Sequence, residues 1–276
     1  MLIALRSYLR ETSEFFPEKR PIEVTATGTG LPGLEIVKFH DSAGVMLRGW
    51  YAPSTNRSAV VMLHGAGGNR ASLLPEAYHL ASRGFGVLLF DWPGQGESDG
   101  EIHWSDSESR ALVAAVDFLA TRLDLDGARL GALGFSMGGA VLARVAPTEP
   151  RLQALVFAGT PSNQARQIQW ENRQWGPLSW LPALWAVQRG GLPVYDDQPQ
   201  DRIGAIAPRP VLIVTGTEDQ TVPIFLAHDL FAAAREPKEL FVVEGAGHGG
   251  YERVAGSTYL DRLSAFFERA LLADSR

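Results

Sequence analysis

The stretch Leu133–Ala140, with the sequence LGFSMGGA, places one serine, Ser136, between glycines at positions 134 and 138. It follows an apolar run, Leu130–Phe135, and leads into a run of small residues, Gly138–Val145. This order predicts a buried strand, a sharp turn and a helix, with the serine hydroxyl exposed at the turn. Small residues are needed on both sides because the strand and helix backbones nearly touch there.

Short apolar runs on either side of this turn alternate with helical patterns. Two of them, joined by a turn that contains Gly44, predict an antiparallel pair; the others are typical of strands buried on both faces of a parallel sheet. The predicted strands are Glu35–Phe39, Val45–Trp50, Ala59–Leu63, Val87–Phe90, Leu130–Phe135, Ala154–Gly159, Val211–Gly216 and Leu240–Gly245. The alternation predicts an α/β fold with a mostly parallel, eight-stranded sheet and helices on both faces.

Local patterns mark three helices. Ser105 and Glu108 have the spacing of a capping box at a helix start. At the N-terminus, Leu2, Leu5 and Leu9 share one face of a short helix, which we expect to pack on the body or to fray in preference to contacting a membrane. In the last helix, one apolar stripe comprises Tyr259, Leu260, Leu263, Phe266, Phe267, Ala270 and Leu271.

The segment 161–209 interrupts the alternation, because it contains no clear strand. Pro177 and Pro182 would interrupt a single helix, so we expect one or two short helices inserted as a lid. Four of the seven tryptophans lie here and are candidate substrate-binding residues or packing residues: Trp170, Trp175, Trp180 and Trp185. The predicted organisation is therefore an N-terminal extension (1–34), a core (35–160 and 210–276) and a lid (161–209).

A serine hydroxyl becomes a good nucleophile when a histidine takes its proton and a carboxylate orients that histidine. Two histidines follow Ser136: His228 lies within a helical pattern, whereas His248 lies in a glycine-flanked loop after the last strand. Asp219 follows the penultimate strand, and Glu218 is a weaker alternative for the acid. Ser136, Asp219 and His248 all follow strand ends, where ligands bind in open α/β sheets.

The developing oxyanion needs backbone donors. We expect one from Met137, which follows the nucleophile, and the second from Ala66 in the loop HGAGGN, His64–Asn69. His64 precedes the serine in the chain, and we expect it to brace its own loop.

These residues together resemble the α/β-hydrolase superfamily. The stretches HGAGGN, FDWPGQGESDG, GFSMGG, GTEDQTVP and GAGHGG are similar to its successive signatures from about residue 35 onward, and the chain is most similar to serine-aminopeptidase-like and small esterase or lysophospholipase members. The resemblance implies Ser136 as nucleophile, Asp219 as acid and His248 as base. It also implies that Asp91, Gly94, Gly96 and Ser98 hold a loop beside the site.

Composition excludes several other functions. The net charge of -6 argues against nucleic acid as a partner, and the absence of cysteine excludes disulfides and thiol nucleophiles. No run reaches the ~20 apolar residues of a membrane span, no signal-peptide core is present, and we expect a cytoplasmic protein. A glycine spacing similar to a dinucleotide-binding motif occurs at Gly28, Gly30 and Gly33, but it leads into a predicted strand and not into a helix, so we predict no cofactor. The histidines do not have the spacing of metal ligands, so we predict no metal site.

We therefore expect a serine hydrolase of the carboxylesterase kind, acting on a small-molecule ester, with short or medium apolar acyl groups preferred. A thioesterase, a peptidase or a carbon–carbon bond hydrolase would use the same residues, and a non-catalytic ligand-binding protein is the alternative from another class. The oligomeric state stays open.

Overall fold

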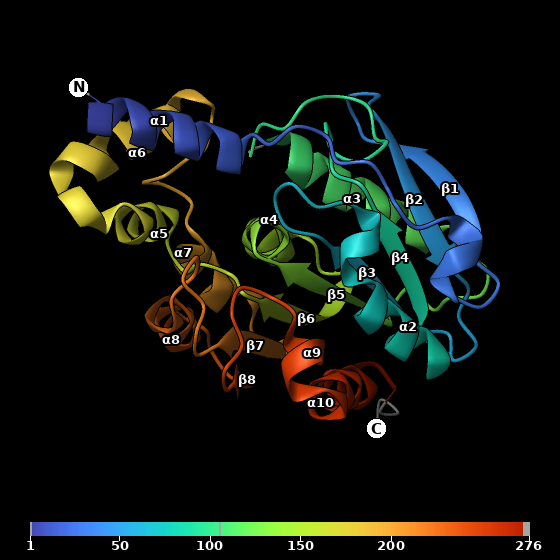
Figure 1. Cartoon of the computed structure of the whole chain (residues 1–276). Helices are drawn as coiled ribbons and strands as arrows, with labels where there is room; N and C mark the ends of the chain where they lie inside the picture. Colours follow the sequence, from blue (N-terminus) through green and yellow to red (C-terminus); the bar gives the residue numbers. More distant parts are fainter. Residues whose placement is uncertain (1, 105, 273–276) are drawn as a thin grey trace.

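The structure is a computed structural model that describes residues 2–104 and 106–272 (Figure 1). In these residues one eight-stranded sheet has the order β1-β2-β4-β3-β5-β6-β7-β8. The pairs β1–β2 and β2–β4 are antiparallel, and the other neighbours are parallel. The strands are β1 (Glu35–His40), β2 (Met46–Ala52), β3 (Ala59–Leu63), β4 (Gly86–Phe90), β5 (Leu130–Phe135), β6 (Leu152–Ala158), β7 (Val211–Gly216) and β8 (Lys238–Val243). The predicted fold class is confirmed.

Helices cover both faces of the sheet (Figure 1). They are α1 (Leu2–Phe15), α2 (Leu74–Ser82), α3 (Asp106–Ala120), α4 (Met137–Val145), α5 (Gln164–Glu171), α6 (Pro177–Arg189), α7 (Pro199–Arg202), α8 (Ile224–Ala233), α9 (Tyr251–Ala255) and α10 (Ser257–Phe267). Shorter helical turns are η1 (Ala26–Thr29), η2 (Arg70–Leu73), η3 (Ala146–Thr148), η4 (Arg173–Trp175), η5 (Ile203–Ile206) and η6 (Glu268–Leu272). The predicted capping residue of α3, Ser105, lies outside the described residues.

The central strands are apolar throughout because each face of the sheet has its own core. Within β3, Val61 and Leu63 pack in one core with α3 and α4, whereas Val60 and Met62 pack in the other with α2 and α10. The period of two along a strand sends successive side chains to opposite faces. The last helix buries Tyr259, Leu263, Phe266 and Phe267, as its apolar stripe predicts.

Strand β8 begins and ends two residues earlier than predicted. The chain turns at Glu244–Gly245, where Gly245 has a φ of 76° and its N–H donates to Thr217 Oγ1 at 2.8 Å. A turn with positive φ favours glycine, and the apolar run before it gives no signal of where pairing stops. The loop that follows carries His248 to the carboxyl end of the sheet.

The segment 161–209, which was predicted to be a lid and is called the lid below, contains two main helices, α5 and α6. Pro177 begins α6 after Gly176, as expected of a proline at the first helical position. The expectation that Pro182 also interrupts the helix is wrong, because it lies inside α6. In the second turn a proline removes only the hydrogen bond toward the carbonyl of Leu178, and the rest of the helix continues.

Helix α1 of the N-terminal extension packs along α6 of the lid (Figure 1). The helix therefore packs on the body, as expected, but the face that carries its leucines does not make the contact, since Leu5 and Leu9 are 52% and 56% exposed. The residues that face the protein are Ser7, Glu11 and Phe15, at a spacing of four. The rings of Phe15 and Trp104 are tilted by 45° with centroids 5.1 Å apart, and the Phe15 carbonyl accepts the Trp104 indole N–H, so α1 joins the lid to the core.

No helix in residues 2–104 and 106–272 combines the length and the apolar character needed to cross a membrane.

Candidate active site

Ser136 occupies the turn between β5 and α4, with a φ of 50° and a ψ of −114°. A positive φ is unusual for a residue with a side chain and marks local backbone strain. The turn is tight: a Cβ atom at Gly134 would lie 2.6 Å from the Gly138 carbonyl oxygen, and one at Gly138 would overlap the Leu63 carbonyl. The glycines therefore permit a backbone that projects the Ser136 hydroxyl toward the neighbouring loops.

The loops after β7 and β8 bring an aspartate and a histidine to this serine. His248 Nε2 lies 3.0 Å from Ser136 Oγ, and His248 Nδ1 lies 2.8 Å from Asp219 Oδ2. The other oxygen of Asp219 accepts the N–H groups of Thr221 and Val222, at 2.9 and 2.7 Å. The carboxylate is buried and fully partnered, which fixes the orientation of the imidazole.

The alternatives weighed from the sequence lie elsewhere. The side chain of Glu218 is exposed, and the hydrogen-bond partner of His248 is the neighbouring Asp219. His228 is exposed on α8.

The two residues expected to supply the oxyanion donors lie at the same region. Ala66 and Met137 both line the cavity that contains Ser136 and His248. Within the described residues, neither N–H donates a hydrogen bond to the protein. Met137 begins α4, so its N–H is one of the helix N-terminal donors that lack an intrahelical acceptor. Two unpaired donors beside a serine hydroxyl can stabilise negative charge on a reacting oxygen.

His64 is a buried structural residue of the loop that carries Ala66. Its Nδ1 lies 2.8 Å from the Gly65 carbonyl oxygen, and the backbone N–H of Trp92 donates to its Nε2 at 3.4 Å. The Trp92 indole N–H donates to the His64 carbonyl at 2.9 Å. Burial lowers the pKa of His64 to about 4, so the ring is neutral near pH 7 and holds the loop in place.

The loop FDWPGQGESDG is held by Asp91 and Ser98. The carboxylate of Asp91 accepts the backbone N–H groups of Arg70 at 2.6 Å and Glu97 at 2.9 Å. The Ser98 hydroxyl donates to the Asp91 carbonyl and accepts the Arg48 N–H. These contacts agree with the structural role that the resemblance implies for this loop.

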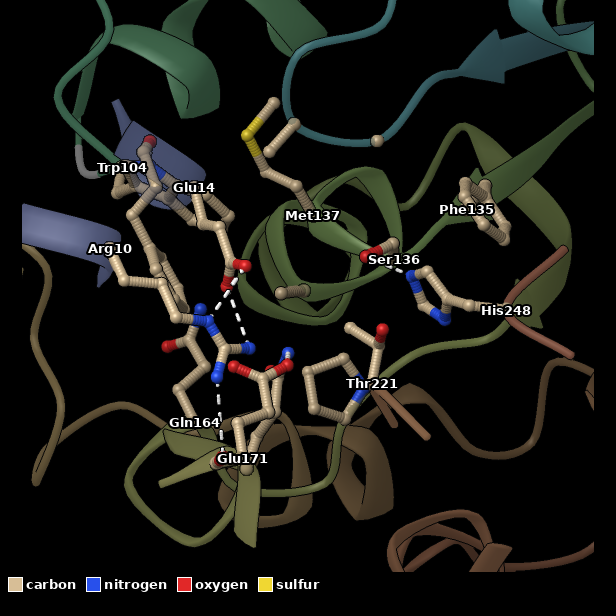
Figure 2. A pocket seen from close by; sticks show the side chains of 16 residues that line it. Arg10, Glu14, Trp104, Phe135, Ser136, Met137, Gln164, Glu171, Thr221 and His248 are labelled. Carbon is tan, nitrogen blue, oxygen red and sulfur yellow. Dashed lines mark hydrogen bonds and ion pairs between the residues drawn. The ribbon is translucent and has the colours of Figure 1, made fainter. Parts of the chain in front are cut away.

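A cavity of about 200 Å³ opens beside Ser136 and His248. This volume is small compared with the roughly 300–1,000 Å³ of most small-molecule sites. Figure 2 shows Ser136 and His248 at one end and Arg10, Glu14 and Trp104 at the other, with Gln164 and Glu171 along the wall. The full lining is Arg10, Glu14, Phe15, Gly65, Ala66, Trp104, Phe135, Ser136, Met137, Ala140, Pro161, Gln164, Gln167, Glu171, Thr221 and His248.

The four lid tryptophans are not among these lining residues. Trp175 and Trp185 are 60% and 56% exposed. Trp170 donates its indole N–H to the Gln220 carbonyl at 3.2 Å, and Trp180 packs against the core. The sequence-based expectation that the lid tryptophans form an aromatic wall of the substrate site does not agree with this set of lining residues. The tryptophan that lines the cavity is Trp104.

Sequence reasoning missed the polar wall of the cavity. Arg10 and Glu14 come from α1, and Gln164 and Glu171 come from α5. The one local signal is the helical spacing of four between Arg10 and Glu14, which form an ion pair with Nε and Oε1 3.0 Å apart. Nothing in the spacing indicates that α1 reaches the serine.

Beside this wall lies the acidic cluster, which we define as Glu11, Glu14 and Glu171. One carboxylate oxygen from each lies within 4.8 Å of those of the other two, so the cluster is geometrically able to hold a cation. Burial, together with the neighbouring carboxylates, raises the pKa of Glu171 to about 8. Burial is also the largest cause of the raised pKa of Glu11, which is about 7.

Comparisons with known proteins agree with this architecture. A family model described as alpha/beta hydrolase fold matches residues 58–184, and one described as TAP-like protein matches residues 182–272. The uncharacterised protein Rv2307c of Mycobacterium tuberculosis is 32% identical over 263 residues, which cover 94% of this chain and 87% of that protein. The uncharacterised protein YfhR of Salmonella typhi is 29% identical, over 87% of this chain and 83% of that protein.

Solved structures with the same fold include esterases. The esterase Pf2001 of Pyrococcus furiosus matches with a TM-score of 0.77 and 20% identity, over 93% of this chain and 99% of that one. The esterase EaEST of Exiguobacterium antarcticum matches with a TM-score of 0.66 and 17% identity, over 84% of this chain and 99% of that one.

Proposed function

The chain belongs to the α/β-hydrolase fold family, and from that premise we propose that it is a serine hydrolase that cleaves carboxylic esters through an acyl-enzyme. The observation that carries the proposal is the chain of contacts from Ser136 through His248 to Asp219, with distances of 3.0 and 2.8 Å, beside two unpaired backbone donors. The esterases of the same fold support a hydrolytic activity without naming its substrate.

The reaction follows from these positions. His248 donates its Nδ1–H to Asp219, so its Nε2 accepts the proton of Ser136 as Oγ attacks the ester carbonyl. The N–H groups of Ala66 and Met137 stabilise the oxyanion of the tetrahedral intermediate. Protonated His248 then gives its proton to the departing alcohol, which leaves the acyl group on Oγ. Water, deprotonated by His248, attacks the acyl carbonyl, and the acid is released as the serine regains a proton.

The cavity volume supports small substrates. We expect the highest kcat/KM for acyl chains of roughly C2–C8, with a gain of at most ~0.8 kcal/mol per buried methylene until the cavity is full. A thioester, an amide or an activated carbon–carbon bond would meet the same nucleophile and the same donors, so the scissile bond itself must be determined by experiment.

A series of p-nitrophenyl esters of increasing acyl length, run beside amide and thioester analogues of the same acyl groups, tests the proposal. We expect ester cleavage in the wild type and a loss of at least about 10⁴-fold in the well-folded Ser136→Ala variant. Amide or thioester turnover that exceeds ester turnover would reassign the bond, and a kcat/KM that keeps rising through C12–C16 would contradict the short-chain preference.

A further inference from the structure

Exposed apolar side chains gather on α1, η4 and α6. Among the described residues, twelve large hydrophobic side chains are exposed, and six of them belong to these three elements. The six are Leu5, Leu9, Trp175, Leu178, Leu181 and Trp185. Single exposed hydrophobic residues are normal on a protein surface, whereas a group of them marks an interaction site. Helices α1 and α6 lie side by side at one end of the molecule (Figure 1), which brings the members of this group together.

Five of these side chains form a continuous strip across the two helices, which we call the apolar band: Leu5, Leu9, Leu178, Leu181 and Trp185. Each is at least half exposed. Residues three or four apart on a helix are neighbours, so the members on α1 adjoin one another, as do those on α6. Tyr8, three residues from Leu5, joins the helices, because its ring centroid lies 5.5 Å from that of Trp185.

The apolar band occupies the solvent-exposed faces of α1 and α6. The buried side chains of α1 include Ser7, Glu11 and Phe15, and those of α6 include Ala183 and Val187. Each helix is thus attached to the protein through one face and presents a second, apolar face to solvent. The packing of the chain itself does not account for that second face, whereas a contact with another body would.

The edge of the apolar band is positively charged, although the whole chain has a net charge of -6. Arg6 of α1 is exposed, and the Arg189 guanidinium of α6 lies 5.5 Å from the centroid of the Trp185 ring. In the part of the chain that the structure describes, no carboxylate forms an ion pair with either arginine. Helix α6 contains no acidic residue, and the exposed acidic residue of α1, Glu14, pairs with Arg10.

We propose that the apolar band docks the protein on the surface of an anionic phospholipid bilayer. Leucine and tryptophan side chains insert between the headgroups and the acyl chains, and tryptophan is especially frequent at that depth. Arg6 and Arg189 pair with lipid phosphates, which strengthens binding to an anionic surface. Neither helix has to cross the bilayer, since an amphipathic face binds in the plane of the interface. This inference goes beyond the proposed hydrolase activity and does not depend on it.

A second copy of the chain is a less suitable occupant of the band. A two-fold symmetric dimer through this surface would bring Arg6 and Arg189 of both copies into one interface. Neither α1 nor α6 offers an exposed, unpaired carboxylate to neutralise them, so such a contact would bury like charges. The phosphate groups of a lipid surface supply the missing negative charge.

Vesicle sedimentation tests the proposal without any turnover. The protein is mixed with sucrose-loaded vesicles of phosphatidylcholine alone, or of an equimolar mixture of phosphatidylcholine and phosphatidylglycerol. We expect the wild type to bind the anionic vesicles about tenfold more tightly than the neutral ones, and added salt to reduce this preference by screening the arginines. Ser136→Ala should bind like the wild type, which separates this test from the hydrolase function.

Substitutions in the apolar band locate the contact. The double variant Leu9→Ser, Leu181→Ser should lower the partition coefficient on anionic vesicles by at least about tenfold, since it removes apolar area that the lipid would bury. Leu123→Ser is the matched control, because Leu123 is 95% exposed and follows α3, outside the band. It should bind like the wild type.

A second double variant tests the charge at the edge of the band. Arg6→Gln with Arg189→Gln should reduce the preference for anionic over neutral vesicles to within about threefold of unity, because both unpaired cations are lost. Arg235→Gln removes an exposed arginine that follows α8, and it should keep the wild-type preference. Circular dichroism confirms that each variant is folded.

The outcomes either support the docking surface or overturn it. If the wild type binds neither kind of vesicle, the proposal is wrong. It is also wrong if the double leucine variant binds as tightly as Leu123→Ser, because the lipid contact would then lie elsewhere. If vesicle binding is absent and analytical ultracentrifugation detects a dimer that the double leucine variant loses, the band is an interface between copies of this chain instead.

Discussion

His248 Nδ1 lies 2.8 Å from Asp219 Oδ2, although the two residues are 29 positions apart and belong to different loops at the carboxyl end of the sheet. Because this contact orients the imidazole toward Ser136, changes at either residue should reduce catalysis without unfolding the protein. We expect His248→Ala to lower kcat by about 10⁴-fold or more, and Asp219→Asn to lower it by less.

The exposed histidine of α8 supplies the control. His228→Ala should keep wild-type ester turnover, measured with the same substrate and with folding checked by circular dichroism. A larger loss in His228→Ala than in His248→Ala would show that the base is assigned to the wrong residue.

The serine turn should tolerate no side chain at Gly138. A Cβ atom there would overlap the backbone carbonyl of Leu63, which cannot move without disturbing β3. Gly138→Ala should therefore lower the free energy of unfolding by about 3 kcal/mol or prevent folding. Gly127→Ala is the matched control, since nothing lies within 4 Å of its added Cβ, and its unfolding in urea should remain close to wild type. Equal effects of the two substitutions would contradict the packing described here.

The acidic cluster should make stability depend on pH. The pKa of Glu171 is raised from 4.5 to about 8, so between these values the folded protein holds more protons than the unfolded chain. The free energy of unfolding should therefore decrease as pH rises from about 5 to about 8. The groups that face Glu171 are Glu11, Glu14 and Arg10, and the raised pKa of Glu11 acts in the same direction.

Removing the titrating group should weaken that dependence. Relative to wild type, Glu171→Gln should gain stability with rising pH, by on the order of 1–3 kcal/mol across this window, as measured by urea unfolding at several pH values. Curves for the two proteins that run parallel from pH 5 to pH 8 would show that Glu171 titrates normally.

Acyl-chain preference should respond to Trp104 and not to the exposed lid tryptophans. Trp104 lines the cavity, so Trp104→Phe should enlarge it and shift the optimum of the p-nitrophenyl ester series toward longer chains. Trp175 is 60% exposed, and Trp175→Ala should leave the length profile unchanged. A shift produced by Trp175→Ala alone would restore the sequence-based expectation that the lid tryptophans bind substrate.

The elements that could be predicted from the sequence are those whose signals are local. Continuous apolar runs indicate buried strands, and glycines around Ser136 mark a turn that only small residues allow. Asp219 and His248 could be found because parallel strands bring their carboxyl ends to one edge. The polar wall could not be found, since the inward face of α1 depends on contacts such as that between Glu11 and Asn172, 161 positions apart.

The orientation of the lid tryptophans also could not be predicted from the sequence. Four tryptophans beside the site suggested an apolar wall, but side chains on a helix face several directions, and their packing partners decide which ones point inward. The contact between Tyr8 and Trp185, with ring centroids 5.5 Å apart, comes from α1, whose position no local pattern reveals.

The central claim is that Ser136 is a nucleophile that forms a covalent intermediate. Incubation with a fluorophosphonate, followed by intact-mass and peptide mass spectrometry, tests it most directly, because the reagent forms a stable adduct with an activated serine. We predict one adduct per chain, located at Ser136 and absent from Ser136→Ala and strongly reduced in His248→Ala. An unlabelled wild-type protein, or a label that persists in Ser136→Ala, would contradict the account.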